Sequence, residues 1–265
     1  MSDYALVLSD EEVARYRMMA ARARTDESDA WQAAGIAPGA HVADVGCGPG
    51  ATLLEIADVV GPAGSVVGVD SDQAAVATAS ALIARSGVDN ATVVTGPADA
   101  TGLARDSFDV VVMRHVLAHN GGREEAIVSH LAGLVRPGGC VYLVDTDMTA
   151  MRMRGTGPDM LDMIERYIEF LRTRGNDTEI GLRLGELLSS AGLAVLEHRG
   201  WYTVMPAPVG MRPPPWAARD AMVAEGIATR EDVDRWQRAL EELDTQEKRP
   251  LGFAPLFSAV GRRPA

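Results

Sequence analysis

The feature that most constrains the fold of this chain is an apolar strand that runs directly into a glycine-rich turn. The strand lies at 41–45, three glycines fall within 46–50, and the pattern of helix 51–59 begins at the end of the turn. A second apolar strand, 65–69, ends on Asp70, 20 residues after the last of those glycines. This order is typical of a βαβ unit that holds a ribose-bearing cofactor over the turn.

Strand and helix patterns continue to alternate through the first part of the chain. The expected elements are helix 72–85, strand 92–95, strand 109–113, helix 123–135 and strand 140–145. The repetition predicts a Rossmann-like, doubly wound, mostly parallel seven-stranded α/β sheet with an antiparallel last strand and a helical cap. Right-handed crossovers bring the carboxyl ends of parallel strands to one edge, so the segments after these strands should form one site. These segments are 44–50, Asp70, 96–99, 114–120 and 145–147.

The pattern changes after residue 148. Helices are expected at 159–173, 178–191, 217–225 and 230–243, with a strand at 193–198 and a last strand at 257–260. At the other end, the capping-box sequence at Ser9 predicts a helix that runs towards Trp31. Tyr4, Arg15 and Tyr16 in this region either close over the cofactor or simply pack. We expect one domain, 1–265, made of a helical lid 1–35, a core 36–148, cap segments 149–192 and 205–250, and last strands 193–204 and 253–263.

Composition excludes several classes of partner. The 265 residues carry a formal net charge of −12, which opposes binding to nucleic acid or to an anionic membrane surface. No apolar run reaches the ~18 residues of a membrane span, and the acidic first residues lack a signal-peptide pattern. Two cysteines do not make a disulfide framework, so a cytoplasmic location is expected. A small molecule is therefore the expected partner, and the oligomeric state, homodimer or otherwise, is left open.

The glycine turn by itself admits two cofactors. Residues 46–51 also satisfy the nicotinamide fingerprint G-x-G-x-x-G/A when Ala51 takes the last position. However, Asp44 stands two residues before the first glycine, where a carboxylate suits a cationic group and repels a pyrophosphate. Pro49 also removes one backbone N–H that would otherwise bind phosphate. A nicotinamide oxidoreductase stays as the alternative that leaves Asp44 and Pro49 unexplained.

The pattern Asp44-x-Gly46-x-Gly48-x-Gly50, followed by Asp70, resembles the first motif and the acidic partner of class I S-adenosylmethionine-dependent methyltransferases. Further segments resemble later motifs of that family in the same order: 96–99, 107–111, 114–119 and 134–139. The likeness covers about residues 36–146 and is greatest to the small-molecule branch of ubiquinone- and menaquinone-type C-methyltransferases. It implies S-adenosylmethionine as the cofactor.

The resemblance assigns roles to the matched positions. Asp44 and the backbone of the turn would hold the methionine end, and Asp70 would accept hydrogen bonds from both ribose hydroxyls. Asp99 is a less certain match, because Pro97 departs from the branch's pattern. The implied cofactor-binding residues are Asp44, Gly46, Cys47, Gly48, Gly50, Asp70, Ser71, Asp72, Ala98, Asp99, Arg114 and His115.

A general base is required only if the acceptor is a carbon acid or a hydroxyl. The candidates are His115, His119 and Tyr202 in that order, each weighed against a purely structural role. No metal site is expected, because the histidines and cysteines lack ligand spacing. The acceptor is expected to be a small, apolar or aromatic metabolite, methylated on carbon, oxygen or nitrogen. A member of the fold that binds the cofactor without transferring a methyl group remains a second alternative.

Overall fold

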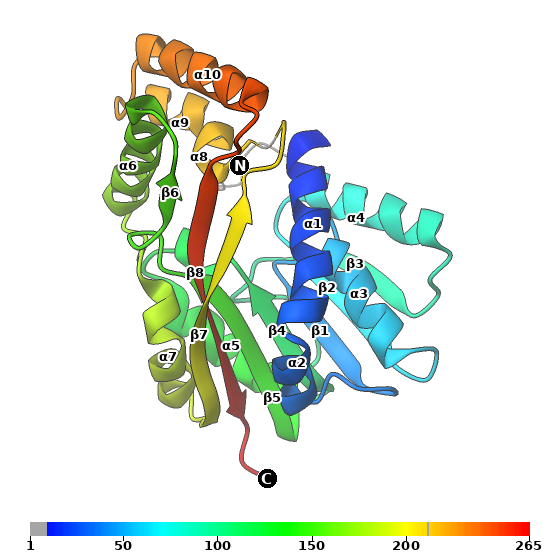
Figure 1. Cartoon of the computed structure of the whole chain (residues 1–265). Helices are drawn as coiled ribbons and strands as arrows, with labels where there is room; N and C mark the ends of the chain where they lie inside the picture. The colour runs from blue at the N-terminus through cyan, green and yellow to red at the C-terminus, as the bar shows by residue number, and fades with distance from the viewer. Residues whose placement is uncertain (1–9, 211) are drawn as a thin grey trace.

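The computed structural model describes residues 10–210 and 212–265 of the chain (Figure 1). Within these residues one eight-stranded sheet has the order β3-β2-β1-β4-β5-β8-β6, and β7 pairs with β8. The strands are β1 (His41–Val45), β2 (Ser65–Asp70), β3 (Ala91–Thr95), β4 (Phe108–Arg114), β5 (Val135–Thr146), β6 (Arg152–Arg154), β7 (Ala194–Pro206) and β8 (Leu251–Arg262). The helices of the core are α1 (Asp10–Asp26), α2 (Ser28–Ala34), α3 (Ala51–Val60), α4 (Gln73–Ser86), α5 (Glu124–Leu134) and α7 (Leu184–Ser190).

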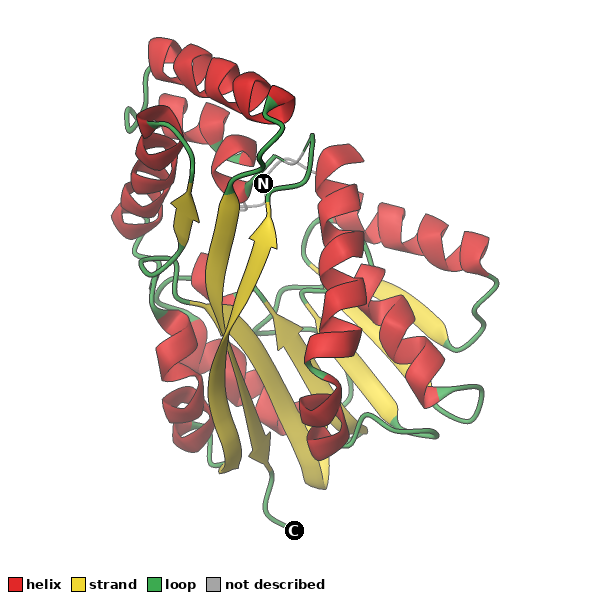
Figure 2. Cartoon of the chain, in the orientation of Figure 1, coloured by secondary structure: helices red, strands yellow, loops and turns green. Residues whose placement is uncertain are grey.

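The sheet confirms the predicted fold. Strands β1 to β5 pair in parallel, and β8 enters antiparallel to β5. The central strands β1 and β4 are apolar on both faces because helices cover both sides: α2 and α3 bury one face, and α5 and α7 the other. Figure 2 shows this helix–sheet–helix layering, with the long β7–β8 pair rising beyond the sheet towards a group of helices.

Four strands differ from the prediction, and two of them, β7 and β8, are simply longer than the expected 193–198 and 257–260. The pairing between β4 and β5 shifts register after Phe108, so that Val135 is already paired and residues 136–139 bulge out before Cys140. Gly138, with φ +83°, permits the bulge. β6 is an unpredicted eighth strand, three residues long, which pairs with the part of β8 that rises above the sheet. A segment this short carries no readable alternation of side chains.

Three helices also differ from the prediction. The first, expected to run unbroken from Ser9 towards Trp31, is divided at Glu27, where the backbone leaves the helical conformation and the side chain turns into the core; Ser9 itself lies outside the described residues. The helix expected at 178–191 begins as the 3₁₀ turn η2 (Ile180–Arg183) before α7. The helix expected at 217–225 is two short ones, α8 (Pro214–Ala217) and α9 (Arg219–Ala224), because a proline pair starts α8 early.

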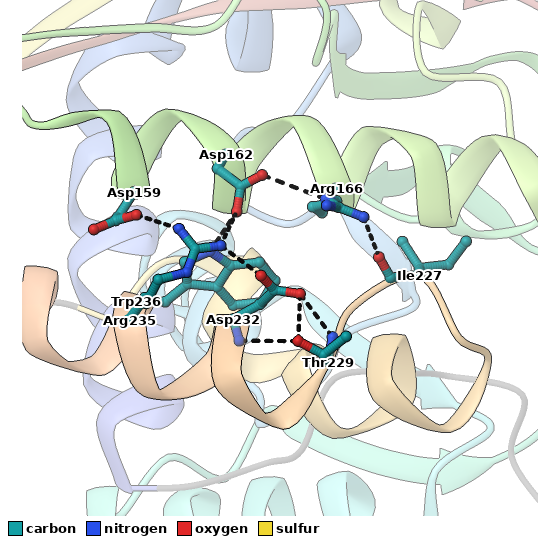
Figure 3. Close-up of polar contacts among 8 residues, drawn as sticks. All are labelled: Asp159, Asp162, Arg166, Ile227, Thr229, Asp232, Arg235 and Trp236. Carbon is teal, nitrogen blue, oxygen red and sulfur yellow. Dashed lines mark hydrogen bonds and ion pairs between the residues drawn. The ribbon is translucent and has the colours of Figure 1, made fainter.

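The cap is held together by an acidic helix face and a central arginine. It contains α6 (Pro158–Thr173) and α10 (Arg230–Thr245), with α8 and α9 between them and the sheet edge (Figure 1). Arg235 pairs with Asp159 on α6, and Trp236 donates its indole N–H to Asp162 at 2.9 Å (Figure 3). Thr229 caps α10 in a complete capping box. Among the described residues, no helix is both long and apolar enough to cross a bilayer.

Candidate functional site

The glycine turn is fastened to the neighbouring strand. After β1 ends, the backbone N–H groups of Gly46 and Cys47 both donate to the carbonyl of Val69, at 2.7 and 3.1 Å. Gly46, Gly48 and Gly50 have φ values of +79°, +53° and +81°, which side chains rarely adopt. Hydrogen bonds to β2 therefore fix the backbone of the turn between β1 and α3, at the carboxyl edge of the sheet.

Neighbouring elements also pack too closely on the turn to admit side chains there. A Cβ on Gly46 would overlap the Val116 side chain, and one on Gly50 would lie 2.9 Å from the Cβ of Ala79 on α4. Over Gly48, the ring of Tyr16 on α1 stands 3.5 Å from where a Cβ would be. The first helix thus covers the turn; Tyr4, for which closure over the cofactor and plain packing were both left open, lies outside the described residues.

Substituting Gly46 by alanine is expected to destabilise the protein by about 2–4 kcal/mol. The cost of a left-handed backbone at alanine and the cost of overpacking against Val116 contribute together. Gly87 is a matched control: its φ is +68° and nothing lies within 4 Å of an added Cβ. Gly87→Ala should carry only the backbone cost of about 1–2 kcal/mol. Urea denaturation of both variants measures the difference, and equal losses would show that Val116 yields without cost.

Asp70 closes β2 beside the turn. Its Oδ2 accepts from the N–H of Gly48 at 2.8 Å, and its Oδ1 accepts from the N–H of Asp72 at 2.9 Å. Burial raises the pKa of Asp70, although these backbone hydrogen bonds oppose the rise. An ionised carboxylate offers about four lone-pair positions. Asp70 therefore orients the turn and keeps acceptor capacity for two further donors, which suits a vicinal diol.

Asp44 is a buried acid with one oxygen that lacks a hydrogen-bond donor among the described residues. The side chain is 2% exposed, and its Oδ2 has no hydrogen-bond partner among the described residues. Burial raises the pKa of Asp44 to about 7, against the lowering effect of Arg114 and with a further rise from Asp70. A buried carboxylate oxygen without a donor fits a cationic ligand group that supplies one.

Arg114, at the end of β4, is engaged by a carboxylate that we did not predict. Its Nη2 and Nε donate to the two carboxylate oxygens of Glu27, at 2.5 and 3.2 Å. Tyr142 donates its hydroxyl to the same carboxylate at 2.8 Å. Both members of the pair are buried. The sequence held one indirect signal: an arginine that ends a buried strand requires a carboxylate partner.

The two histidines after β4 are half-buried beside the site. His115 has a left-handed backbone, φ +56°, and its N–H donates to the Val144 carbonyl at 2.8 Å. Burial, then the charges of Arg114 and Arg15, hold the pKa of His115 well below its ordinary value. Burial, then Arg15 and Arg174, lower the pKa of His119 to about 4. Both imidazoles are therefore neutral at pH 7 and are weak proton acceptors.

Other predicted residues lie around this centre with partners of their own. Burial raises the pKa of the Cys47 thiol well above its ordinary value, which makes it a packing group. Asp72 caps α4 by accepting from Ala74 at 2.9 Å, and Ser71, just before it, is exposed. Asp99, which follows the half-buried Ala98, forms an ion pair with Arg123 at 2.7 Å.

Tyr202, by contrast, points to solvent. It is 66% exposed on β7 and contacts Phe253 edge-on. No contact within the described residues joins it to His115 or His119. Among residues 10–210 and 212–265, no group of three or more histidine, cysteine or acidic side chains is placed to hold a metal ion.

Known proteins resemble the chain in both sequence and structure. Residues 42–139 match the family described as Methyltransferase domain. Nocamycin O-methyltransferase of Saccharothrix syringae is 36% identical over 106 residues, which cover 40% of this chain and 38% of that protein. Demethylmenaquinone methyltransferase of Lactococcus lactis is 24% identical over 65% of this chain and 75% of that protein. The structure of a SAM-dependent methyltransferase from Aquifex aeolicus has a TM-score of 0.53 at 19% identity and covers 72% of this chain and 92% of that one. The match to the first of these relatives thus spans well under half of its length.

Proposed function

We propose that this chain, which belongs to the class I S-adenosylmethionine-dependent methyltransferases, transfers a methyl group from that cofactor to a small, apolar or aromatic metabolite. The observation that carries the proposal is the buried, uncompensated Asp44 carboxylate beside the glycine turn and Asp70. A cationic amino group and a ribose diol, both present in this cofactor, match these acceptors. A pyrophosphate would instead meet two carboxylates and a turn that Pro49 deprives of one donor.

The residues of the site divide the binding between them. Asp44 and the backbone of 46–50 hold the amino-acid end, and Asp70 holds the ribose. Ser71, Asp72 and Ala98 border the adenine, while Asp99 is committed first to Arg123. The cofactor supplies an electrophilic methyl group on a sulfonium, which is already a good leaving group. The protein therefore contributes mainly position, and holding acceptor and methyl in line can supply about 7–11 kcal/mol of the barrier.

Proton transfer is a secondary task of this site. His115 and His119 are neutral at pH 7 because burial and nearby cations lower the pKa of each. A neutral imidazole can accept a proton from a hydroxyl or carbon acid, yet it does so weakly at these pKa values. We therefore infer that the acceptor reaches the site as a good nucleophile. Tyr202, exposed on β7, is a substrate contact only if the acceptor extends along that strand.

The apolar side chains of the cap support an apolar acceptor. The buried face of α6 carries methionine and aromatic side chains, and it faces the same core as α8 to α10. Two relatives bear the names Nocamycin O-methyltransferase and demethylmenaquinone methyltransferase. Those names favour a small organic acceptor for this chain as well, and the acidic net charge of −12 disfavours nucleic acid.

Calorimetric titration with S-adenosylhomocysteine, run beside NADH, tests the cofactor half of the proposal. We expect binding of the former and none of the latter. Incubation with S-adenosylmethionine and a panel of hydroquinones, phenols and hydroxylated polyketides, followed by mass spectrometry, tests the transfer: a product in which one methyl group has replaced a hydrogen is expected. A folded protein that binds NADH alone would overturn the proposal. Cofactor binding without product from any acceptor class would favour a fold member that does not transfer methyl.

A further inference from the structure

Besides Tyr16 over the turn, the N-terminal helices place one buried carboxylate beside the site. Glu27 lies at the junction of α1 and α2, is 1% exposed, and also accepts from the indole N–H of Trp31 at 3.4 Å. Its main partner is Arg114, to which it presents both oxygens in a two-pronged ion pair. α2 packs against β5 and β8 (Figure 1). The Glu27 carboxylate, just before α2, therefore lies on the sheet face that carries Tyr142.

The sheet register places Arg114 beside Asp44. Asp44 on β1 pairs with Val112 on β4, and Val112 pairs in turn with Tyr142 on β5. Alternate residues of a strand share a face, so Arg114, two residues after Val112, lies on the same face as Asp44, diagonally across one strand spacing. The guanidinium therefore binds Glu27 while its charge also acts on Asp44, whose pKa it lowers.

We propose that Glu27 is a positioning residue for the cofactor site: by binding Arg114 it keeps the Asp44 carboxylate available for the cofactor's ammonium group. This inference rests on the proposed function. A buried cation without a partner is strongly unfavourable, so Arg114 must pair with some anion. With Glu27 present, Asp44 keeps an oxygen that has no donor among the described residues. Without the Glu27 charge, Asp44 is the carboxylate on the same sheet face to which Arg114 can turn, and that pairing would occupy the ammonium site.

Glu27→Gln isolates the charge, because glutamine has nearly the same shape and its carbonyl can still accept from Tyr142. We expect S-adenosylhomocysteine to bind at least about tenfold more weakly to this variant in calorimetry. The matched control is Glu55→Gln, which removes an ion pair between α1 and α3, Arg24–Glu55, without touching Arg114. This control should bind as the wild type does.

The double variant Glu27→Gln/Arg114→Met separates positioning from mere structure. It removes the competing cation, so we expect the double variant to bind S-adenosylhomocysteine at least about threefold more tightly than Glu27→Gln does. If Glu27 only stabilised the fold, or if Arg114 itself bound the cofactor, the double variant would bind no better than Glu27→Gln. That result, or unchanged binding in Glu27→Gln, overturns the proposal.

Should Glu27→Gln fail to fold, the double variant, in which no unpaired buried cation remains, is measured in its place; a folded double variant without detectable binding overturns the proposal. Glu27→Asp keeps the charge, and its affinity should exceed that of Glu27→Gln. Loss of binding in the wild type itself would instead refute the proposed function, so the two failures are distinguishable.

Discussion

Substituting Asp70 by alanine is expected to weaken S-adenosylhomocysteine binding by at least about 100-fold, since hydrogen bonds to a charged acceptor contribute about 1.5–3 kcal/mol each. The variant removes the acceptor for both ribose hydroxyls. It also releases the N–H groups of Gly48 and Asp72, which the carboxylate now orients. The turn that binds the amino-acid end is therefore loosened as well. Isothermal calorimetry measures the effect.

Asp70→Asn is the matched control for this loss. Asparagine keeps one carbonyl oxygen and the shape of the side chain, so one backbone hydrogen bond and one ribose contact can persist. Its affinity is expected to fall between those of the wild type and the alanine variant. Thermal unfolding of each variant shows whether the turn or the whole domain has changed. Unaltered affinity in a folded Asp70→Ala protein would contradict the assignment of the ribose site to this residue.

The parallel core could be predicted because its signals are local. β1 occurs at the expected positions 41–45, and β2 and β4 differ from their expected bounds by at most one residue at each end. Apolar runs bounded by glycine turns determine such strands without reference to the rest of the chain. The convergence of Asp44, the turn and Asp70 then follows from chain topology, since parallel strands end on one edge.

What could not be predicted depends on contacts between distant residues. In the sequence, nothing distinguishes Glu27 from the other acidic residues of its helix. Its partners Arg114 and Tyr142 lie 87 and 115 positions away. The break between α1 and α2 has the same cause, because the side chain that turns inward ends the regular helix. Tyr202 illustrates a different gap: a period of two tells which residues share a face of β7, and only the packed structure tells which face is exposed.

Substitution of Asp44 should change cofactor binding and the stability of the ligand-free protein in opposite directions. In Asp44→Asn the ammonium group loses its charged partner, and we expect S-adenosylhomocysteine to bind about 10–100-fold more weakly. The ligand-free protein, however, should become more stable above pH 7, because a neutral amide costs less to bury than a carboxylate. A residue that only stabilised the fold would not show both effects.

The sign of the pH dependence follows from the pKa of Asp44, which burial raises from 3.8 to about 7 in the folded protein. The folded state then holds the proton more tightly than the unfolded state. The corresponding stability is fully present below pH 3.8 and is lost as the pH rises through about 7. The wild type should therefore lose on the order of 2–4 kcal/mol relative to Asp44→Asn between those limits.

Urea denaturation of both ligand-free proteins from pH 5 to pH 8 checks this difference. Burial also raises the pKa of Asp145 to about 7, but that contribution is common to both proteins and cancels when the two curves are subtracted. Saturating S-adenosylhomocysteine should raise the free energy of unfolding of the wild type more than that of Asp44→Asn. The reason is that the bound ammonium group compensates the buried carboxylate, which only the wild type has. Parallel curves for the two proteins would mean that Asp44 already has a compensating partner, and the case for an ammonium site at this position would fail.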